Sequence, residues 1–133
     1  MASLFGMLHP EFRKSLMTGS QKRLIRQAEE VTESVAYLRS QLRLYSDAVQ
    51  RFVDHVEKGE TALTAAHNAN VARYRQLATE AIEGFEGARR QMRLALFALG
   101  QEEGASISQL GRALGVSRQL ASRIAADAAE ELE

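Results

Sequence analysis

Hydrophobic residues recur at a regular spacing from about residue 20 to residue 58. The steps alternate between four and three residues over five heptads, which is the spacing of a helix that packs along another helix. The recurring positions are Leu24, Ala28, Val31, Val35, Leu38, Leu42, Tyr45, Val49, Phe52 and Val56. In heptad notation, Val35, Leu42 and Val49 take a positions, and Val31, Leu38, Tyr45 and Phe52 take d positions. The pattern predicts a long first helix that ends at Gly59.

A second run of the same kind follows from about Ala62 to Leu99, with Thr61 as its N-cap and Gly100 as its stop. Its seam positions are Val71, Tyr74, Ala78, Ala81, Phe85, Ala88, Met92, Ala95 and Leu99. The connection of residues 58–61 is so short that the two helices are expected to form an antiparallel hairpin.

The fold class follows from what the pattern lacks. No segment alternates apolar and polar residues with the period of two that a half-buried strand requires, and the single proline is Pro10. The sequence therefore predicts an all-α protein with three regions. These are an N-terminal segment with a short helix over residues 1–19, a two-helix coiled-coil hairpin over 20–100, and a C-terminal region over 101–133 that borrows the end of the preceding helix.

The apolar stripe on the first helix is wider than a two-stranded seam requires. Ile25 and Val53 flank the seam and are apolar, while Ser34 and Gln41 are neutral, although a free parallel dimer usually has charged pairs there. We expect a second copy of the chain to cover this surplus in a dimeric four-helix arrangement. A three-helix monomer, capped by the N-terminal helix, is the alternative. The residues predicted to form the dimer contact are Val31, Val35, Leu38, Leu42, Tyr45, Val49 and Phe52.

The C-terminal pattern is different, because two short amphipathic helices are separated by a break of about three residues. The stretch reads SISQLGRALGVSRQLASRIAADAAEEL over residues 106–132. Ser106 and Gln109 have the spacing of a capping box. Gly115 is expected to end the first helix, and Ser117 to cap a second helix that begins at Arg118.

The segment LGRALGVSRQLASRIA within this stretch resembles the helix-turn-helix of bacterial repressors, resolvases and related DNA-binding proteins. The resemblance implies that Gly111 lies where the two helices cross, that Gly115 makes the turn, that Val116 packs beneath it, and that Ile124 fixes the second helix. Ala121 departs from the family pattern, which usually has valine or isoleucine there. The resemblance further implies that the second helix enters the major groove of DNA.

The same resemblance assigns contacts with double-stranded DNA. Transferred position by position, Gln119, Ser122 and Arg123 are the expected base readers, since arginine and glutamine can each form paired hydrogen bonds with a base edge. Phosphate contacts are expected from Ser117, Arg118, Ser108 and Gln109, with a basic reserve just upstream in Arg89, Arg90 and Arg93.

Charge opposes this interpretation in part. The chain has a formal net charge of zero, and residues 101–133 contain three arginines and six carboxylates. DNA-binding modules normally have a basic surface, because neutralised phosphates supply much of their affinity. A module of low charge gains from being present in two copies, which agrees with the expected dimer.

Enzymatic chemistry finds little support in the sequence. There is no cysteine, no glycine-rich phosphate loop and no Glu-x-x-His pair. His55 and His67 could approach each other across the hairpin and hold a metal, but we interpret them as surface residues beside the turn. We therefore expect no cofactor and no enzymatic activity.

Taken together, the sequence predicts a cytoplasmic, bacterial-type, dimeric transcriptional regulator that binds DNA in a sequence-specific manner. No segment has the length of apolar sequence that a membrane span requires. The alternative is a coiled-coil interaction or assembly protein whose helix-turn-helix docks a protein partner.

Overall fold

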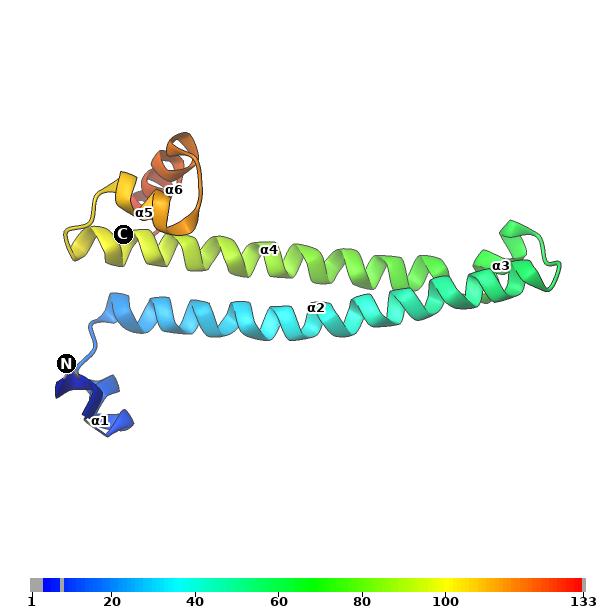
Figure 1. Ribbon diagram of the computed structural model, residues 1–133, viewed down its shortest axis with the longest axis horizontal. Helices are drawn as coiled ribbons and strands as arrows, with labels where there is room; N and C mark the ends of the chain where they lie inside the picture. Colours follow the sequence, from blue (N-terminus) through cyan, green and yellow to red (C-terminus); the bar gives the residue numbers. More distant parts are fainter. Residues whose placement is uncertain (1–3, 8, 133) are drawn as a thin grey trace. The chain divides into compact units, whose positions relative to one another are not determined.

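The computed structural model describes residues 4–7 and 9–132 (Figure 1). Its helices are η1 (Leu4–Met7), α1 (Pro10–Ser15), α2 (Gly19–Glu57), α3 (Ala62–Asn68), α4 (Val71–Glu102), α5 (Ile107–Leu114) and α6 (Arg118–Glu131). No strand occurs among the described residues, so the predicted all-α class is confirmed. Within this same part of the chain, none of the helices combines the length and apolar character that a membrane crossing demands.

The chain divides into two compact units. Residues 30–89 form one of them, which we call the hairpin unit, and residues 1–29 together with 90–133 form the other, which we call the terminal unit. Both long helices, α2 and α4, contribute a segment to each unit. The start of the first long helix is thus grouped with the C-terminal helices, and the three regions 1–19, 20–100 and 101–133 stay a prediction.

In the hairpin unit, residues 30–57 of α2 and 71–89 of α4 run side by side in opposite directions (Figure 1). The predicted seam of α4 is its least exposed side, with Ala78 and Ala81 buried. On α2 the less exposed side combines the d residues with the positions three residues after them: Val31, Ser34, Leu38, Gln41, Tyr45, Ala48, Phe52 and His55. The d and g positions of α2 thus face α4, whereas the sequence predicted that the a and d positions would.

The a positions of α2 are left on the surface as a result. Val35, Leu42, Val49 and Val56 are 36%, 43%, 40% and 43% exposed. A helix with one neighbour buries one face, and the a positions lie on the flank of that face. Of the residues predicted for dimerisation, Val31, Leu38, Tyr45 and Phe52 are therefore half-buried within the chain. Val35, Leu42 and Val49 remain exposed.

The helix predicted over residues 62–99 is interrupted. The helix α3 ends at Asn68, where the N–H of Ala69 donates to the carbonyl of Ala65 and the N–H of Asn70 donates to the carbonyl of His67. Asn70 then adopts a φ of 55°, which lies in the left-handed region, before α4 begins at Val71. Asparagine tolerates this conformation better than most residues and competes with helix formation through its own side chain. The sequence prediction of one continuous helix was wrong here.

Gly100 has a different role from the predicted helix stop. It lies inside α4, which continues to Glu102, and Gly104 supplies the left-handed residue beyond the helix with a φ of 92°. A Cβ atom added at Gly100 would lie 2.4 Å from Cδ2 of Leu110. The missing side chain therefore lets α5 approach α4 closely.

The terminal unit has a closed apolar core. Phe97 and Leu94 of α4 are its largest fully buried side chains. They pack with Leu110 of α5 and with one face of α6, and partly buried side chains surround this set. The buried residues of α6 are Ala121, Ile124, Ala125 and Ala128. This core fixes α5 and α6 on the C-terminal part of α4 and so positions the candidate site.

Candidate nucleic-acid interface

The start of α5 is held by a reciprocal pair of hydrogen bonds. The N–H of Gln109 donates to Oγ of Ser106 at 3.1 Å, and the N–H of Ser106 donates to Oε1 of Gln109 at 2.8 Å. Two of the free N–H groups at this helix start are satisfied in this way. The side chain of Gln109, predicted as a phosphate contact, is therefore engaged in capping its own helix.

The connection between α5 and α6 is a tight turn at Gly115, which has φ 68° and ψ 30°. Its N–H donates to the carbonyls of Gly111 and Arg112, and the N–H of Val116 donates to the carbonyl of Gly111 at 3.0 Å. The next residue, Ser117, caps α6, because its Oγ accepts from the N–H of Leu120 at 3.1 Å. Glycine is favoured at such a left-handed position because it has no Cβ.

The two helices approach each other most closely at Gly111 and Ala121. A Cβ added at Gly111 would lie 2.8 Å from Cβ of Ala121, so Gly111 accepts no larger side chain unless one of the two helices shifts. Ala121 and Ile124 are buried, and Val116 packs partly buried against the same core. The alanine that departs from the helix-turn-helix pattern thus fits a glycine on the facing helix.

The first turns of α6 present an exposed row of polar side chains. Ser117, Arg118, Gln119, Ser122 and Arg123 are all exposed. Ser117 is engaged in the cap. Within residues 4–7 and 9–132, the side chains of the other four make no hydrogen bond or ion pair with another residue.

The local charge differs from that of the region as a whole. Residues 104–126 contain Arg112, Arg118 and Arg123 and no carboxylate. The acidic residues of α6 follow later, where Asp127 and Glu131 pair with Arg90. The surface of α5 and of the first half of α6 therefore has three positive charges without opposing ones, although the region 101–133 is acidic overall.

The three upstream arginines differ in their surroundings. Arg89 pairs with Glu86 at 2.6 Å and lies over the ring of Phe85 in the hairpin unit. Arg90 donates two hydrogen bonds to Glu131, at 2.6 and 3.2 Å, and lies 3.6 Å from Asp127. The hydrogen bonds that Arg90 donates to Glu131 raise the pKa of Arg90 and lower the pKa of Glu131.

Arg93 is the upstream arginine without such a pairing. Its Nε is buried and has no hydrogen-bond partner among the described residues. It lines a small hollow between α4 and α6 together with Arg123. Of the three upstream arginines predicted to contact phosphate, Arg93 is thus the one without an ion pair to a described residue.

Arg112 is a candidate that the sequence analysis did not assign. It is exposed on α5, donates a hydrogen bond to Oγ of Ser108 at 3.2 Å, and lines a shallow hollow with Ser108 and Arg118 between α5 and α6. It is the single charged residue of α5, four residues after Ser108, and this spacing places both side chains on one face. That signal was available in the sequence.

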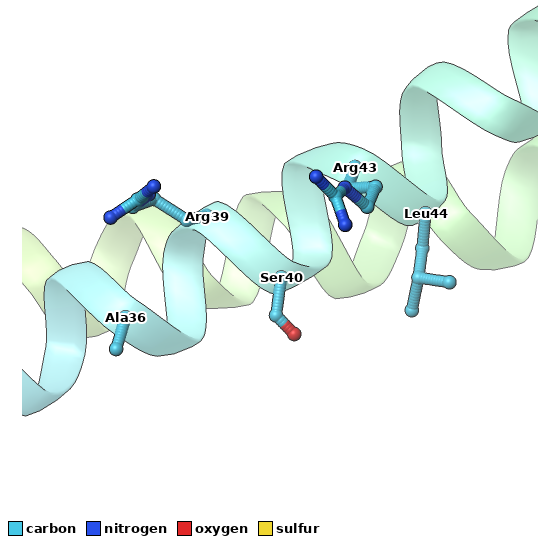
Figure 2. Close-up of a pocket in the computed structure, with 5 residues that line it drawn as sticks. All are labelled: Ala36, Arg39, Ser40, Arg43 and Leu44. Carbon is cyan, nitrogen blue, oxygen red and sulfur yellow. The ribbon is translucent and has the colours of Figure 1, made fainter.

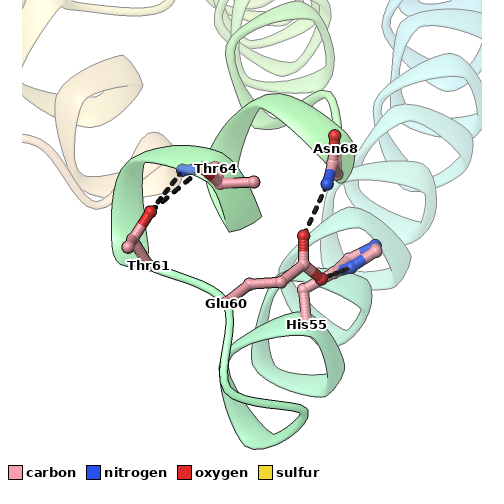
Figure 3. Close-up of polar contacts among 5 residues, drawn as sticks. All are labelled: His55, Glu60, Thr61, Thr64 and Asn68. Atoms are coloured by element: carbon pink, nitrogen blue, oxygen red, sulfur yellow. Dashed lines mark hydrogen bonds and ion pairs between the residues drawn. The ribbon is translucent and has the colours of Figure 1, made fainter.

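A polar cluster closes the tip of the hairpin unit (Figure 3). Glu60 receives a hydrogen bond from Asn68 at 2.5 Å and pairs with Nδ1 of His55, and the pairing with His55 lowers the pKa of Glu60. His67 is exposed and does not take part. No group of three metal-ligating side chains occurs within the part of the chain that the structure describes. The cluster ties the end of α2 to α3.

A second basic feature lies on the outer side of α2. Arg39 and Arg43 point to one side of the helix, and Ala36, Ser40 and Leu44 point to the other, around a shallow surface hollow (Figure 2). No other element of the hairpin unit lines this hollow, so it is a groove between side chains of one helix.

A comparison with known proteins found no match: no family model, curated protein or solved structure matches the chain.

Proposed function

We propose that the chain binds double-stranded DNA in a sequence-specific manner and regulates transcription, with α6 in the major groove. The observation that supports this most strongly is the row of exposed, unpaired polar side chains on the first turns of α6. Arg118, Gln119 and Ser122 lie there on a surface without carboxylates. A helix of this kind, set on a tight turn and held by a separate core, suits the major groove, which admits one α-helix.

Within this proposal the side chains take different roles. Gln119 and Ser122 are assigned to base edges, since glutamine can bond to adenine with both its donor and its acceptor. Ser117 and Arg118 at the start of α6, with Arg112 on α5, are assigned to phosphates, where the free N–H groups of the helix start add to the attraction. Arg123, also predicted from the sequence as a base reader, is exposed on the same helix and lines the hollow with Arg93.

A salt titration with matched variants tests the proposal. Full-length protein is titrated into a fluorescently labelled pool of random duplexes by anisotropy at several salt concentrations. Affinity should fall as salt rises, with a slope that counts the neutralised phosphates. Arg118→Ala and Arg112→Ala should each make the slope less steep by about one.

Arg73→Ala is the control for these variants, because Arg73 is also exposed but lies in the hairpin unit. It should leave the slope unchanged. An affinity that does not depend on salt, or equal effects of Arg73→Ala and Arg118→Ala, would reject the proposal and favour a protein partner for α6.

We further propose that the protein acts as a homodimer through the exposed a positions of α2. Val35, Leu42, Val49 and Val56 repeat every seven residues and span about 30 Å of one helix. Such a row is long enough for a coiled-coil contact with a second helix. A second copy of the chain matches this row, because a twofold axis between Leu42 and Val49 places Leu42 of each copy opposite Val49 of the other.

Charge supports an antiparallel pairing of the two copies. Residues 35–46 contain Arg39 and Arg43 and no carboxylate. Residues 47–57 contain Asp47, Asp54 and Glu57, and their one arginine, Arg51, lies over the ring of Tyr74. Antiparallel pairing sets the basic half of one helix against the acidic half of the other. A twofold dimer of this kind should prefer a DNA site that is an inverted repeat.

A further inference from the structure

The hollow between α4 and α6 brings together three arginines from two helices. Its lining consists of Arg90, Arg93, Leu94, Leu120, Arg123, Ile124 and Asp127, and its volume is about 180 Å³. Arg90 and Arg93 come from one turn of α4, and Arg123 comes from α6. The apolar floor is part of the core of the terminal unit, which holds the two helices in place.

The charges of this hollow are only partly balanced. Arg90 is bonded to Glu131 through both guanidinium Nη atoms, and Asp127 lies 3.6 Å from it. Arg93 and Arg123 have no ion pair among the described residues. Three guanidinium groups thus meet two carboxylates, which leaves one positive charge in excess.

Arg93 also has a buried donor that lacks an acceptor. Its Nε is shielded from water and makes no hydrogen bond with any described residue. A buried donor without a partner is costly, and an anion that reaches it would remove that cost. Guanidinium groups bind phosphate oxygens through two parallel N–H groups, and two of them from different helices can surround one phosphate.

We propose that Arg93 and Arg123 together bind a single phosphate group in this hollow. If the phosphate belongs to the DNA backbone, the inference rests on the proposed function and gives Arg123 a positioning contact. A free phosphorylated small molecule is the other source of the same group. With either source, the bound phosphate links α4 to α6 and holds α6 against the core of the terminal unit.

The salt dependence of DNA binding tests whether the two arginines share one phosphate. Arg93→Ala and Arg123→Ala should each weaken binding to specific and random duplexes by the same factor, with a slope less steep by about one. The slope of the double variant should also be less steep by about one, because a single phosphate contact is lost. If the two arginines held separate phosphates, the slope would be less steep by about two, and that result would overturn the shared site.

A second measurement needs no DNA and so separates this inference from the proposed function. The Nε–H resonances of Arg93 and Arg123 are followed by NMR in the full-length protein as inorganic phosphate replaces chloride at constant ionic strength. Both resonances should shift with one common midpoint. Arg93→Ala should abolish the phosphate-dependent shift of the Arg123 resonance, and Arg93→Lys should make that shift smaller.

Two variants complete the design. Arg75→Ala removes an exposed arginine elsewhere on α4 and should leave the slope and both resonances unchanged. Asp127→Asn removes the carboxylate beside the hollow and should tighten phosphate binding several-fold, which a loss of folding could not produce. Should phosphate shift neither resonance and Arg93→Ala leave the salt slope at its wild-type value, the site does not exist. Should DNA fail to bind while phosphate still shifts both resonances, the proposed function fails and the phosphate site stands.

Discussion

The two units of this protein bury different kinds of residue. In the described part of the hairpin unit, the buried apolar residues are all alanines: Ala48, Ala65, Ala69, Ala78 and Ala81. In the terminal unit, the buried set includes Phe97, Leu94, Leu110 and Ile124. The larger apolar side chains of the hairpin unit are half-buried or exposed instead.

This difference shows where each unit obtains its stability. Burial of a large apolar side chain contributes about 1.5–3 kcal/mol, whereas an alanine contributes far less. The terminal unit can therefore stabilise itself through its own core. The hairpin unit has an unused apolar surface, and its large side chains gain their full contribution when another helix covers them. The terminal unit thus has a core of large side chains of its own, whereas the hairpin unit has the apolar surface that we propose for the dimer contact.

The largest expected effect comes from truncating the core of the terminal unit. Phe97→Ala should lower the free energy of unfolding by about 3–5 kcal/mol, because it removes a fully buried ring and leaves a cavity. Phe85→Ala, in the half-buried seam of the hairpin unit, should cost clearly less. Urea unfolding followed by circular dichroism compares the two. Equal losses would contradict the difference between the units.

The next effect concerns assembly. Leu42→Glu combined with Val49→Glu should convert the proposed dimer to a monomer, since each buried carboxylate without a partner costs about 2 kcal/mol or more. Analytical ultracentrifugation over a range of concentrations measures the change.

Leu44→Glu is the matched control for that pair. Leu44 is 41% exposed, close to the 43% of Leu42, but it lies off the row of a positions. It should leave the dimer intact. A wild-type chain that sediments as a monomer at every concentration would refute the proposed dimer outright.

Two glycines of α4 provide a comparison within one helix. Gly84→Ala, in the hairpin unit, meets no atom within 4 Å and should stabilise the helix by about 0.5–1 kcal/mol. Gly100→Ala, in the terminal unit, meets the buried side chain of Leu110 and should destabilise by about 1–3 kcal/mol. Thermal unfolding should therefore shift in opposite directions, and a shift of the same sign for both would show that the close approach of α5 is not needed.

The smallest effect is an acid-side dependence on pH. Arg90 lowers the pKa of Glu131 below its ordinary value of 4.5, so the pairing contributes stability above that value and loses it as pH falls through the lowered pKa. Glu131→Gln should remove this dependence in the terminal unit. Glu60→Gln should do the same in the hairpin unit, where His55 lowers the pKa of Glu60. Unfolding midpoints measured below pH 5 would be unaltered by either substitution if the pairings add nothing.

Local sequence rules predicted most of the helices. The heptad spacing marked α2 and the seam of α4, while Ser106 with Gln109 and the N-cap residue Thr61 marked two helix starts. The turn at Gly115 was also predicted, because its left-handed backbone depends on one residue. Such features involve neighbours within four residues along the chain, and their energetics can be read from the sequence alone.

Tertiary packing decided what the local pattern left open. Heptad spacing defines a stripe about a helix but not which flank meets the neighbour, and the hairpin selected d and g over a and d. The close contacts of Gly100 with Leu110 and of Gly111 with Ala121 join residues ten apart, so no local rule distinguishes such glycines from helix stops. Likewise, Arg90 is paired and Arg93 is unpaired only because α6 brings Glu131 to the first of them. The number of charged residues can be counted in the sequence, whereas the availability of each charge to a ligand depends on which opposite charges the fold places beside it.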